Sequence, residues 1–208
     1  MCDPGFTSQG SHQYILRLPR SMPSPFLYSG ASLVLYGHSL GSALAIRSAA
    51  ASCDAQHELL MVTNSSHSDA QEELVALSSA PDAIVLEGAF SSIGDVVAAY
   101  LPSLPSLPST SLAVSLLEGS PLSAAGSLAF ATLEHAPRLC VRGIFQVHGS
   151  LDLTVSVSVG RKLHAALPGR AWWTEVPWAG HDPLLHSGAQ ERLRQFFFEE
   201  VAPGGNAR

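Results

Sequence analysis

Four short, mainly apolar segments recur along the chain, at Ala31–Tyr36, Ala83–Leu86, Gly143–Val147 and Trp172–Val176. The first three are nearly continuous apolar runs, and each is followed within two residues by a glycine. Continuous runs of this length are typical of parallel strands that are covered on both faces of a sheet. The pattern therefore predicts four strands, and Tyr14–Leu18 is a candidate for one more before them.

Helical segments alternate with these strands. Leu40–Ala51 is rich in alanine, Val157–Leu167 follows the third strand, and Gly188–Val201 is amphipathic. A shorter helix is expected at Asp69–Leu77, because residues 68–71 have the spacing of a capping box. Alternation of strands and helices predicts an α/β fold, a mostly parallel sheet with helices on both faces.

The predicted sheet belongs to one domain, at residues 31–201. Within it, residues 95–140 lack a clear hydrophobic period and include a Leu-Pro-Ser repeat at Leu101–Ser109. The three prolines of this repeat argue against a long helix, so an irregular, lid-like insertion is expected there. Of the flanking segments, residues 1–30 are expected to be partly disordered and residues 202–208 to form a disordered tail.

The composition is that of a globular protein. Charged residues make up 13% of the 208 residues and hydrophobic residues 46%, which excludes a chain that is mainly disordered. The net charge of −6, without a cluster of lysines or arginines, argues against a nucleic-acid partner. No apolar stretch approaches the roughly 18 residues of a membrane-spanning helix. Peripheral contact with a membrane and the oligomeric state are left open.

The three cysteines, Cys2, Cys53 and Cys140, are widely spaced and include no Cys-x-x-Cys pair. This spacing predicts neither a disulfide framework nor a zinc site, and it favours a reducing, intracellular compartment. Residues 1–11 contain no basic region followed by an apolar run, so no secretory signal is predicted. Glycine-rich phosphate loops are absent as well, and neither a metal nor an organic cofactor is expected.

One motif carries candidate chemistry. Residues 37–41 (GHSLG) match G-x-S-x-G, a turn whose glycines allow the backbone to crowd while the serine hydroxyl is lifted above the sheet. On the order of 0.2 such matches would arise by chance in a chain of this composition, so the pattern alone is weak evidence. Its context strengthens it, because Ser39 lies where a predicted strand passes directly into a predicted helix.

An activated serine requires a base and an acid that orients the base. Asp152 follows the strand Gly143–Val147, and His181 follows the strand Trp172–Val176. The carboxyl ends of parallel strands lie at the same edge of a sheet, so loops from three strands can converge there. The order Ser39, Asp152, His181 is that of the α/β-hydrolase triad. The sequence therefore predicts a Ser-Asp-His triad.

Other residues near this predicted site remain as alternatives. His186 is a second candidate for the base, and Glu87, which follows the strand Ala83–Leu86, is a second candidate for the acid. Glu87 is better explained as a supporting hydrogen-bonding group. His38 and His148 are expected to pack or to form hydrogen bonds, and Trp178 is close enough to the predicted base to line a pocket.

The segments LVLYGHSLGSALA, DAIVLEGAFSSI, HGSLD and VPWAGHD, in this order, resemble the α/β-hydrolase superfamily. More narrowly, they resemble its serine lipases of the monoacylglycerol and lysophosphatidylserine lipase type, over about Ser32 to Phe198. The resemblance implies that Ser39 is the nucleophile, Asp152 the acid and His181 the base, with the backbone N–H of Leu40 as an oxyanion donor. It also implies hydrolysis of a carboxylic ester, in particular a lipid acyl ester, through an acyl-enzyme.

The family places several strands, and a loop with a second oxyanion N–H, before the serine. Only 38 residues precede Ser39, so the sheet is expected to lack several amino-terminal strands. This leaves a second hypothesis, a truncated hydrolase-like domain that is weakly active or inactive. A third hypothesis is a protein acyl-thioesterase (depalmitoylase), which uses the same triad chemistry.

Overall fold

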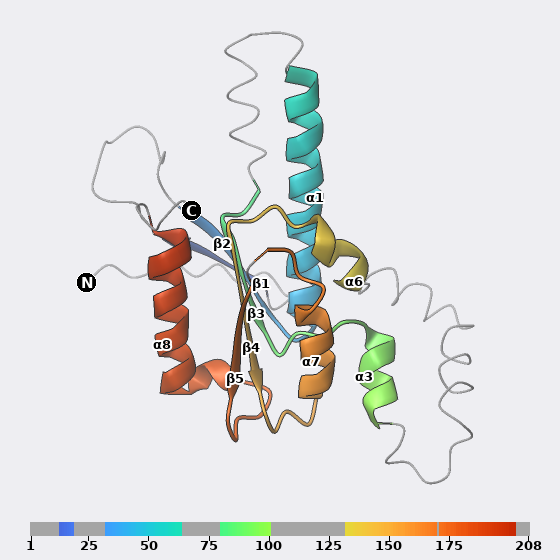
Figure 1. The fold of residues 1–208 in the computed structure, drawn as a ribbon, viewed down its shortest axis with the longest axis vertical. Helices are drawn as coiled ribbons and strands as arrows, with labels where there is room; N and C mark the ends of the chain where they lie inside the picture. Colours follow the sequence, from blue (N-terminus) through green and yellow to red (C-terminus); the bar gives the residue numbers. More distant parts are fainter. Residues whose placement is uncertain (1–12, 19–31, 64–79, 101–131, 170, 203–208) are drawn as a thin grey trace.

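Five strands form one sheet in the order β1-β2-β3-β4-β5 (Figure 1). The structure is a computed structural model, and it describes residues 13–18, 32–63, 80–100, 132–169 and 171–202. Strands β2 to β5 are parallel, and β1 is antiparallel to β2. The strands are β1 (Gln13–Leu18), β2 (Ser32–His38), β3 (Ala83–Glu87), β4 (Gly143–Gly149) and β5 (Trp172–Val176).

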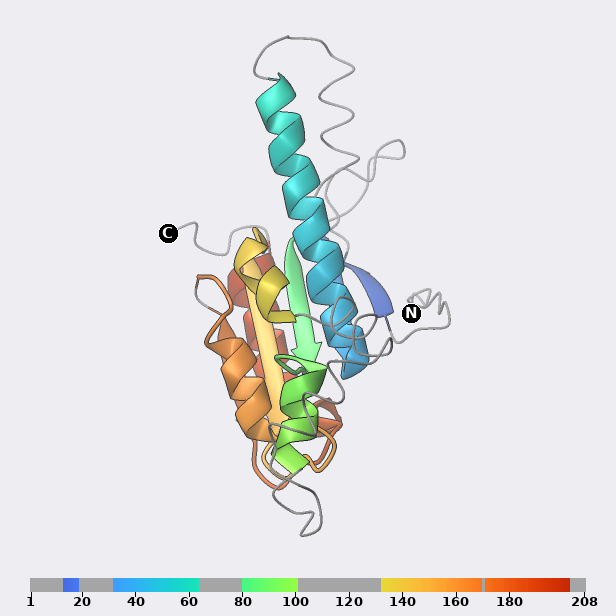
Figure 2. The ribbon, with the colours of Figure 1, turned by 90° about the vertical axis from the view of Figure 1, so that its right-hand side faces the viewer.

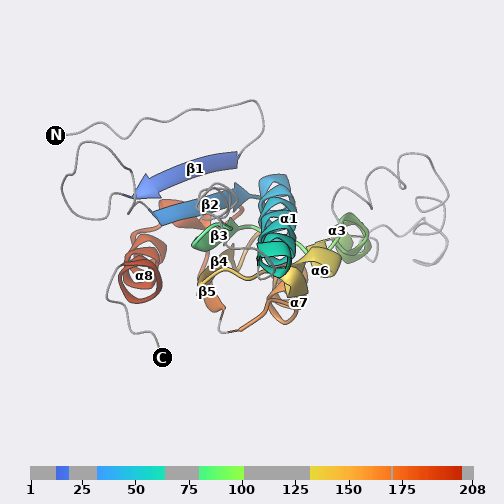
Figure 3. The same ribbon diagram turned by 90° about the horizontal axis from the view of Figure 1, so that it is seen from above.

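The helices cover both faces of this sheet, as Figure 3 shows. Helices α1, α6 and α7 lie on one side, and α8 lies on the other. The predicted α/β class, a mostly parallel sheet covered by helices, is confirmed. The helices are α1 (Leu40–Thr63), α3 (Ile93–Tyr100), α6 (Thr132–His135), α7 (Val157–His164) and α8 (Ser187–Phe196), with a π-helical turn at Phe197–Val201 and short 3-10 turns at Ala136–Arg138 and Pro183–Leu185.

The predicted strands are present, and three of them run further than the apolar pattern indicated. β2 continues to His38 and β3 to Glu87, because these two residues are themselves paired. β4 continues to Gly149, which pairs with Val176 of β5. The candidate strand at Tyr14–Leu18 is β1, so within the described residues β2 is flanked on both sides and is not an edge strand.

Helix α1 is twelve residues longer than predicted and extends past the sheet (Figure 2). The prediction ended it at Ala51 because the residues that follow are polar. These residues contain neither glycine nor proline until well after Thr63, and Ser52 donates its hydroxyl to the carbonyl of Ser48 within the helix, at 3.0 Å. Polar residues without a breaker continue a helix along its solvent-exposed part. At the other helices the boundaries differ by a few residues, as expected where helix ends fray.

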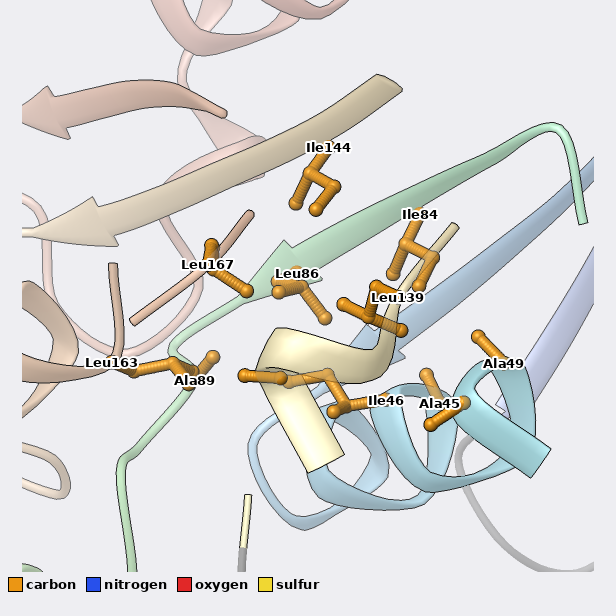
Figure 4. Close-up of a cluster of buried hydrophobic side chains, with 12 residues drawn as sticks. Ala45, Ile46, Ala49, Ile84, Leu86, Ala89, Leu139, Ile144, Leu163 and Leu167 are labelled. Atoms are coloured by element: carbon orange, nitrogen blue, oxygen red, sulfur yellow. The ribbon is translucent and has the colours of Figure 1, made fainter. Parts of the chain in front are cut away.

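The two larger clusters of the core lie one on each face of the sheet, and a smaller one consists of Ala43, Phe90, Val155 and Val159. Alternate residues of the central strands point to opposite faces, so that a strand buried on both sides contributes to both layers. Figure 4 shows the layer under α1, which includes Ile84, Leu86, Ile144, Ile46 and Leu163. The layer under α8 includes Val34, Val85, Phe145, Val147 and Phe196.

A disulfide joins Cys53 of α1 to Cys140, with the Cα atoms 5.7 Å apart. The prediction that the cysteines form no disulfide was therefore wrong. The two residues are 87 positions apart, and only the packing of α1 beside the segment that leads into β4 brings them together. Sequence spacing carries no signal for such a contact.

Several predictions fall on parts of the chain outside the described residues. These are the helix at Asp69–Leu77, residues 101–131 of the expected insertion, the segments 1–12 and 19–30, and the tail from residue 203. Among the helices that the structure describes, none is both long and apolar enough to cross a membrane.

The disulfide predicts a specific pattern of stabilities. Cys53→Ser, Cys140→Ser and the double variant are expected to lose a similar free energy of unfolding, about 2–4 kcal/mol, because each removes the same cross-link. Urea unfolding of the three variants measures these losses. Wild type whose disulfide has been reduced with dithiothreitol is the control, and its free energy of unfolding should be close to that of the variants. Losses that add in the double variant would contradict a shared cross-link.

Candidate active site

Ser39 occupies the turn between β2 and α1. Its backbone has φ 52°, in the left-handed region that residues with a side chain rarely adopt, so the turn is strained. The N–H of Ser39 donates to the carbonyl of Glu87, at 2.8 Å, and the carbonyl of Ser39 accepts from the N–H of Ser42, at 3.0 Å. These bonds hold the strained turn against the end of β3. This is the strand-to-helix turn that the G-x-S-x-G pattern predicts.

Gly37 is required by the crowding of this turn. A Cβ atom at position 37 would lie 2.5 Å from the carbonyl oxygen of Gly41 and 2.6 Å from the Cα of Ser42. Both atoms belong to the backbone, which cannot move aside easily. The hydroxyl of Ser42 donates to the carbonyl of Gly37 at 2.7 Å and so closes the turn.

Leu40 is the first residue of α1. The N–H groups of a first helical turn have no acceptor within the helix, and the positive end of the helix dipole lies there. An N–H at this position, directly after Ser39, is suited to stabilise negative charge on an oxygen bound beside the serine.

Asp152 and His181 are in direct contact. The Nδ1 atom of His181 lies 2.7 Å from Oδ2 of Asp152. The other carboxylate oxygen, Oδ1, accepts the N–H groups of Thr154 and Val155, both at 2.8 Å. The residue is only 6% exposed, and its side chain is fully buried. The structure thus joins two of the three predicted triad residues.

The two groups shift each other's titration. Burial acts to raise the pKa of Asp152, but hydrogen bonds from His148, from His181 and from the two N–H groups outweigh it and lower that pKa. The hydrogen bond to Asp152 raises the pKa of His181, against an opposing effect of burial. Since a carboxylate accepts the bond, the proton of a neutral His181 sits on Nδ1, which leaves Nε2 as an acceptor. Within the described part of the chain, Nε2 has no hydrogen-bond partner.

Ser39 lies at the same edge of the sheet as these two residues. The register aligns His38 with Glu87, Glu87 with Val147, and Gly149 with Val176, so the strand ends that carry the three residues are adjacent. Among the described residues the hydroxyl of Ser39 forms no hydrogen bond with His181. His38, the residue before Ser39, makes contact with the loop after β5, because its ring centroid lies 4.7 Å from that of His181.

The alternative residues take other positions. His186 is exposed at the start of α8, where its carbonyl accepts the N–H groups of Ala189 and Gln190. No contact of His186 with Asp152 is present in the part of the chain that the structure describes. Glu87 is buried and accepts the hydroxyl of Tyr36 and the N–H of Leu184, at 2.8 Å for the latter. It therefore ties the end of β3 to the loop that carries His181.

Three further residues lie near the site. His148 is wholly buried, and its Nε2 atom lies 3.4 Å from Oδ2 of Asp152, four residues on. Tyr100 of α3 donates its hydroxyl to the carbonyl of Leu153. Trp178, which was expected to pack in the core or at its rim and is close enough in sequence to His181 to line a pocket, is 82% exposed and has φ 63°. The expectation that His148 packs or forms hydrogen bonds is confirmed, but the sequence did not indicate Asp152 as its neighbour.

The loops that follow β4 and β5 pass each other without a side chain between them. A Cβ atom at Gly149 would lie 2.0 Å from the carbonyl oxygen of Gly180 and 2.3 Å from that of Ala179. The N–H of Leu151 donates to the carbonyl of Ala179 at 2.9 Å. This close approach brings the aspartate of one loop to the histidine of the other.

Among known proteins, similarity to this chain was found only for solved structures. No protein-family model matches this sequence, and no curated protein matches it. The chain is similar to an α/β-hydrolase enzyme from the metagenome of sediments of the Mar Chica lagoon, Morocco (16% identity, TM-score 0.46, covering 81% of this chain and 62% of that one).

Two further similar structures are a meta-cleavage product hydrolase from Pseudomonas fluorescens and a monoacylglycerol lipase from Paleococcus ferrophilus. The first has 18% identity and a TM-score of 0.45, over 79% of this chain and 64% of that one. The second has 15% identity and a TM-score of 0.44, over 79% of this chain and 66% of that one. The chain thus spans somewhat less than two thirds of the length of these proteins.

The contact at Gly149 generates a prediction. Gly149→Ala is expected to push the two loops apart, to lower the free energy of unfolding by about 1–3 kcal/mol, and to return the pKa of His181 toward its ordinary value of 6.5. Urea unfolding and an NMR titration of the His181 ring measure these effects. Gly180→Ala is the control in the same loop, because its Cβ would have no atom within 4 Å. Equal effects of the two substitutions would contradict the proposed contact.

Proposed function

We propose that this protein is a serine hydrolase that cleaves carboxylic esters through an acyl-enzyme, with Ser39, Asp152 and His181 as its triad. The observation that carries the proposal is the 2.7 Å contact between His181 and Asp152 at the sheet edge where Ser39 occupies a strained, left-handed turn. Each residue follows a different strand, and buried backbone contacts hold each loop. Strain that is maintained in this way is typical of functional positions.

The proposed reaction has two steps. In the first, Ser39 Oγ attacks the ester carbonyl, and Nε2 of His181 takes the hydroxyl proton. The tetrahedral intermediate collapses, His181 returns the proton to the leaving alcohol, and the acyl group stays on Ser39. In the second, a water molecule attacks the acyl-enzyme and His181 takes a proton from it. As the tetrahedral intermediate collapses, His181 gives that proton to Ser39 Oγ, and the carboxylic acid and the free serine hydroxyl are released. The N–H of Leu40 stabilises the oxyanion in both steps.

The electrostatics of the described residues support these roles. Asp152 keeps its charge at neutral pH because its pKa is lowered, and it fixes the tautomer of His181 that leaves Nε2 free to accept a proton. The imidazolium that forms during attack is stabilised by the same carboxylate. Asp182 and Glu87 also favour it, since their charges contribute to the raised pKa of His181.

Apolar side chains around the site support an acyl ester of a lipid as the substrate class. Leu151 and Leu153 on the loop after β4, and Trp178 and Leu185 after β5, are large hydrophobic residues exposed to solvent. They belong to the loops that carry Asp152 and His181. An acyl chain is the part of a lipid ester that such side chains can accommodate.

The serine role predicts selective covalent labelling. A fluorophosphonate probe is expected to label the wild type and not Ser39→Ala, because it reacts with activated serines. Ser52→Ala is the matched control, since Ser52 is bonded within α1 and lies outside the site. Absence of labelling in folded wild type would contradict the proposal and favour the inactive hydrolase-like alternative.

Hydrolysis of a p-nitrophenyl ester distinguishes the two candidate bases, His181 and His186. His181→Ala is expected to lower kcat by about 10³-fold or more, and His186→Ala to leave it within about twofold. The reverse result would assign the base to His186. Parallel assays of a monoacylglycerol and an acyl-thioester rank the lipase and thioesterase alternatives.

The raised pKa of His181 predicts the pH profile. Only neutral His181 can accept the serine proton, so kcat/KM is expected to rise with pH through a pKa above the ordinary 6.5. Asp152→Asn removes the hydrogen bond and the charge that raise this pKa. The profile of any residual activity should therefore move to lower pH, with kcat reduced about 10⁴-fold. A profile that stays in place would show that Asp152 does not set the basicity of the base.

A further inference from the structure

His148 is a wholly buried histidine at the end of β4, facing α7. A Cβ atom at Gly160 of α7 would lie 2.4 Å from its Nδ1 atom, so the ring is pressed against the helix backbone. On another side, the ring stacks on Trp173 of β5, with the centroids 6.1 Å apart and the planes 23° apart. The ring is therefore held on two sides and cannot turn freely.

The hydrogen bonds of His148 identify its tautomer. Its Nε2 atom lies 2.8 Å from the carbonyl oxygen of Val155. A carbonyl oxygen only accepts, so Nε2 carries a proton. The Nδ1 atom has no partner among the described residues. A neutral ring with its proton on Nε2 avoids a buried donor without an acceptor.

The same Nε2 atom faces Asp152, at 3.4 Å from Oδ2. Asp152 is thus surrounded by four N–H groups. The N–H groups of Thr154 and Val155 donate to Oδ1, and the Nδ1–H of His181 donates to Oδ2. The Nε2 atom of His148, whose N–H donates to the carbonyl of Val155, lies 3.4 Å from the same Oδ2. The two backbone groups fix one oxygen, and the two imidazoles lie around the other.

We propose that His148 is a positioning residue, which holds the carboxylate of Asp152 in the orientation that receives the Nδ1–H of His181. The inference rests on the proposed function and extends its triad by one residue that does not touch the substrate. His148 acts on Asp152 directly, and it also holds the carbonyl of Val155, whose N–H is a donor to the same carboxylate. It thereby fixes both the side chain and the loop that bonds to it.

Gln146 shows that a polar side chain buried on this face of β4 does not necessarily contact Asp152. Gln146 lies two residues before His148, is wholly buried, and donates to the carbonyl of Gly160 at 2.9 Å. In the described residues it has no bond to Asp152. The position of His148, next to the end of the strand, places its ring beside the carboxylate.

The test replaces His148 by Met and by Gln. His148→Met removes the donor and keeps a side chain of similar size, whereas His148→Gln retains an N–H donor at a position close to Nε2. For hydrolysis of a p-nitrophenyl ester, His148→Met is expected to lower kcat about tenfold with little change in KM, whereas His148→Gln keeps kcat within about threefold of wild type.

The second readout is the titration of His181, followed by NMR of its ring and by the acid limb of kcat/KM. Without His148 the carboxylate is no longer held toward His181, and the hydrogen bond that raises the pKa of His181 weakens. Both midpoints are therefore expected to move down by about 0.5 pH unit in His148→Met and not in His148→Gln. The other titratable groups that face His181, namely His38, Asp182 and Glu87, are unchanged in both variants.

His164→Met is the matched control. His164 packs on the same Trp173, with the ring centroids 5.3 Å apart, and makes no contact with Asp152 in the part of the chain described. It should leave kcat and the midpoints unchanged. The inference is overturned if the midpoints stay in place in His148→Met, or if they shift equally in His148→Gln.

Two measurements keep the inference separate from the proposed function. If wild type takes no fluorophosphonate and hydrolyses no ester, the proposed function fails, while the NMR titration still tests the contact between His148 and Asp152. If His148→Met does not fold, His148→Asn is used in its place. The amide nitrogen of the asparagine would lie near the position of the histidine Nδ1 atom and not near that of Nε2, so this variant also lacks the donor. His148→Asn is then expected to shift the midpoints and His148→Gln is not.

Discussion

The candidate site depends on the close approach of two loops, the one after β4 and the one after β5. Among the described residues, three backbone N–H groups donate across this approach: Ser150 to the carbonyl of Val176, Leu151 to that of Ala179, and Trp178 to the hydroxyl of Ser150, at 2.9–3.0 Å. Because the contact is made by backbone, any side chain at Gly149 would separate the loops. The hydrogen bond between Asp152 and His181 follows from this packing, since each residue lies on one of the loops.

A second link joins this pair of loops to the turn that holds Ser39. Glu87 at the end of β3 accepts the N–H of Ser39 with its backbone carbonyl and the N–H of Leu184 with its side chain. A buried carboxylate is stable only when its oxygens are satisfied, and here Tyr36 and Leu184 bond to them. Glu87 thus connects the serine turn, β2 and the histidine loop. It serves the site through this connection, without any bond to His181 among the described residues.

Electrostatics and packing act together around Asp152. Its burial would favour the neutral acid, and four surrounding N–H groups reverse that preference. A charged carboxylate in this position makes His181 a stronger base, which the proposed acyl transfer requires. Outside the site, the disulfide between Cys53 and Cys140 joins the helix that begins at Leu40 to the segment leading into β4. The helix that starts at the serine turn is therefore covalently linked to the segment just before the strand that leads to Asp152.

The sequence by itself determined the strands, their parallel arrangement and the turn around Ser39, because these depend on local patterns: apolar runs, glycines and strand–helix alternation. It also indicated Asp152 and His181, since both follow directly after predicted strands. The choice of His181 over His186 as the partner of Asp152, the burial of His148 beside that carboxylate, the disulfide and the length of α1 were decided by the tertiary structure. Each of these depends on atoms far apart in the sequence or on the surface that a segment meets, and no local pattern encodes them. A hydrogen bond of 2.7 Å requires two loops in register, and only the folded sheet provides it.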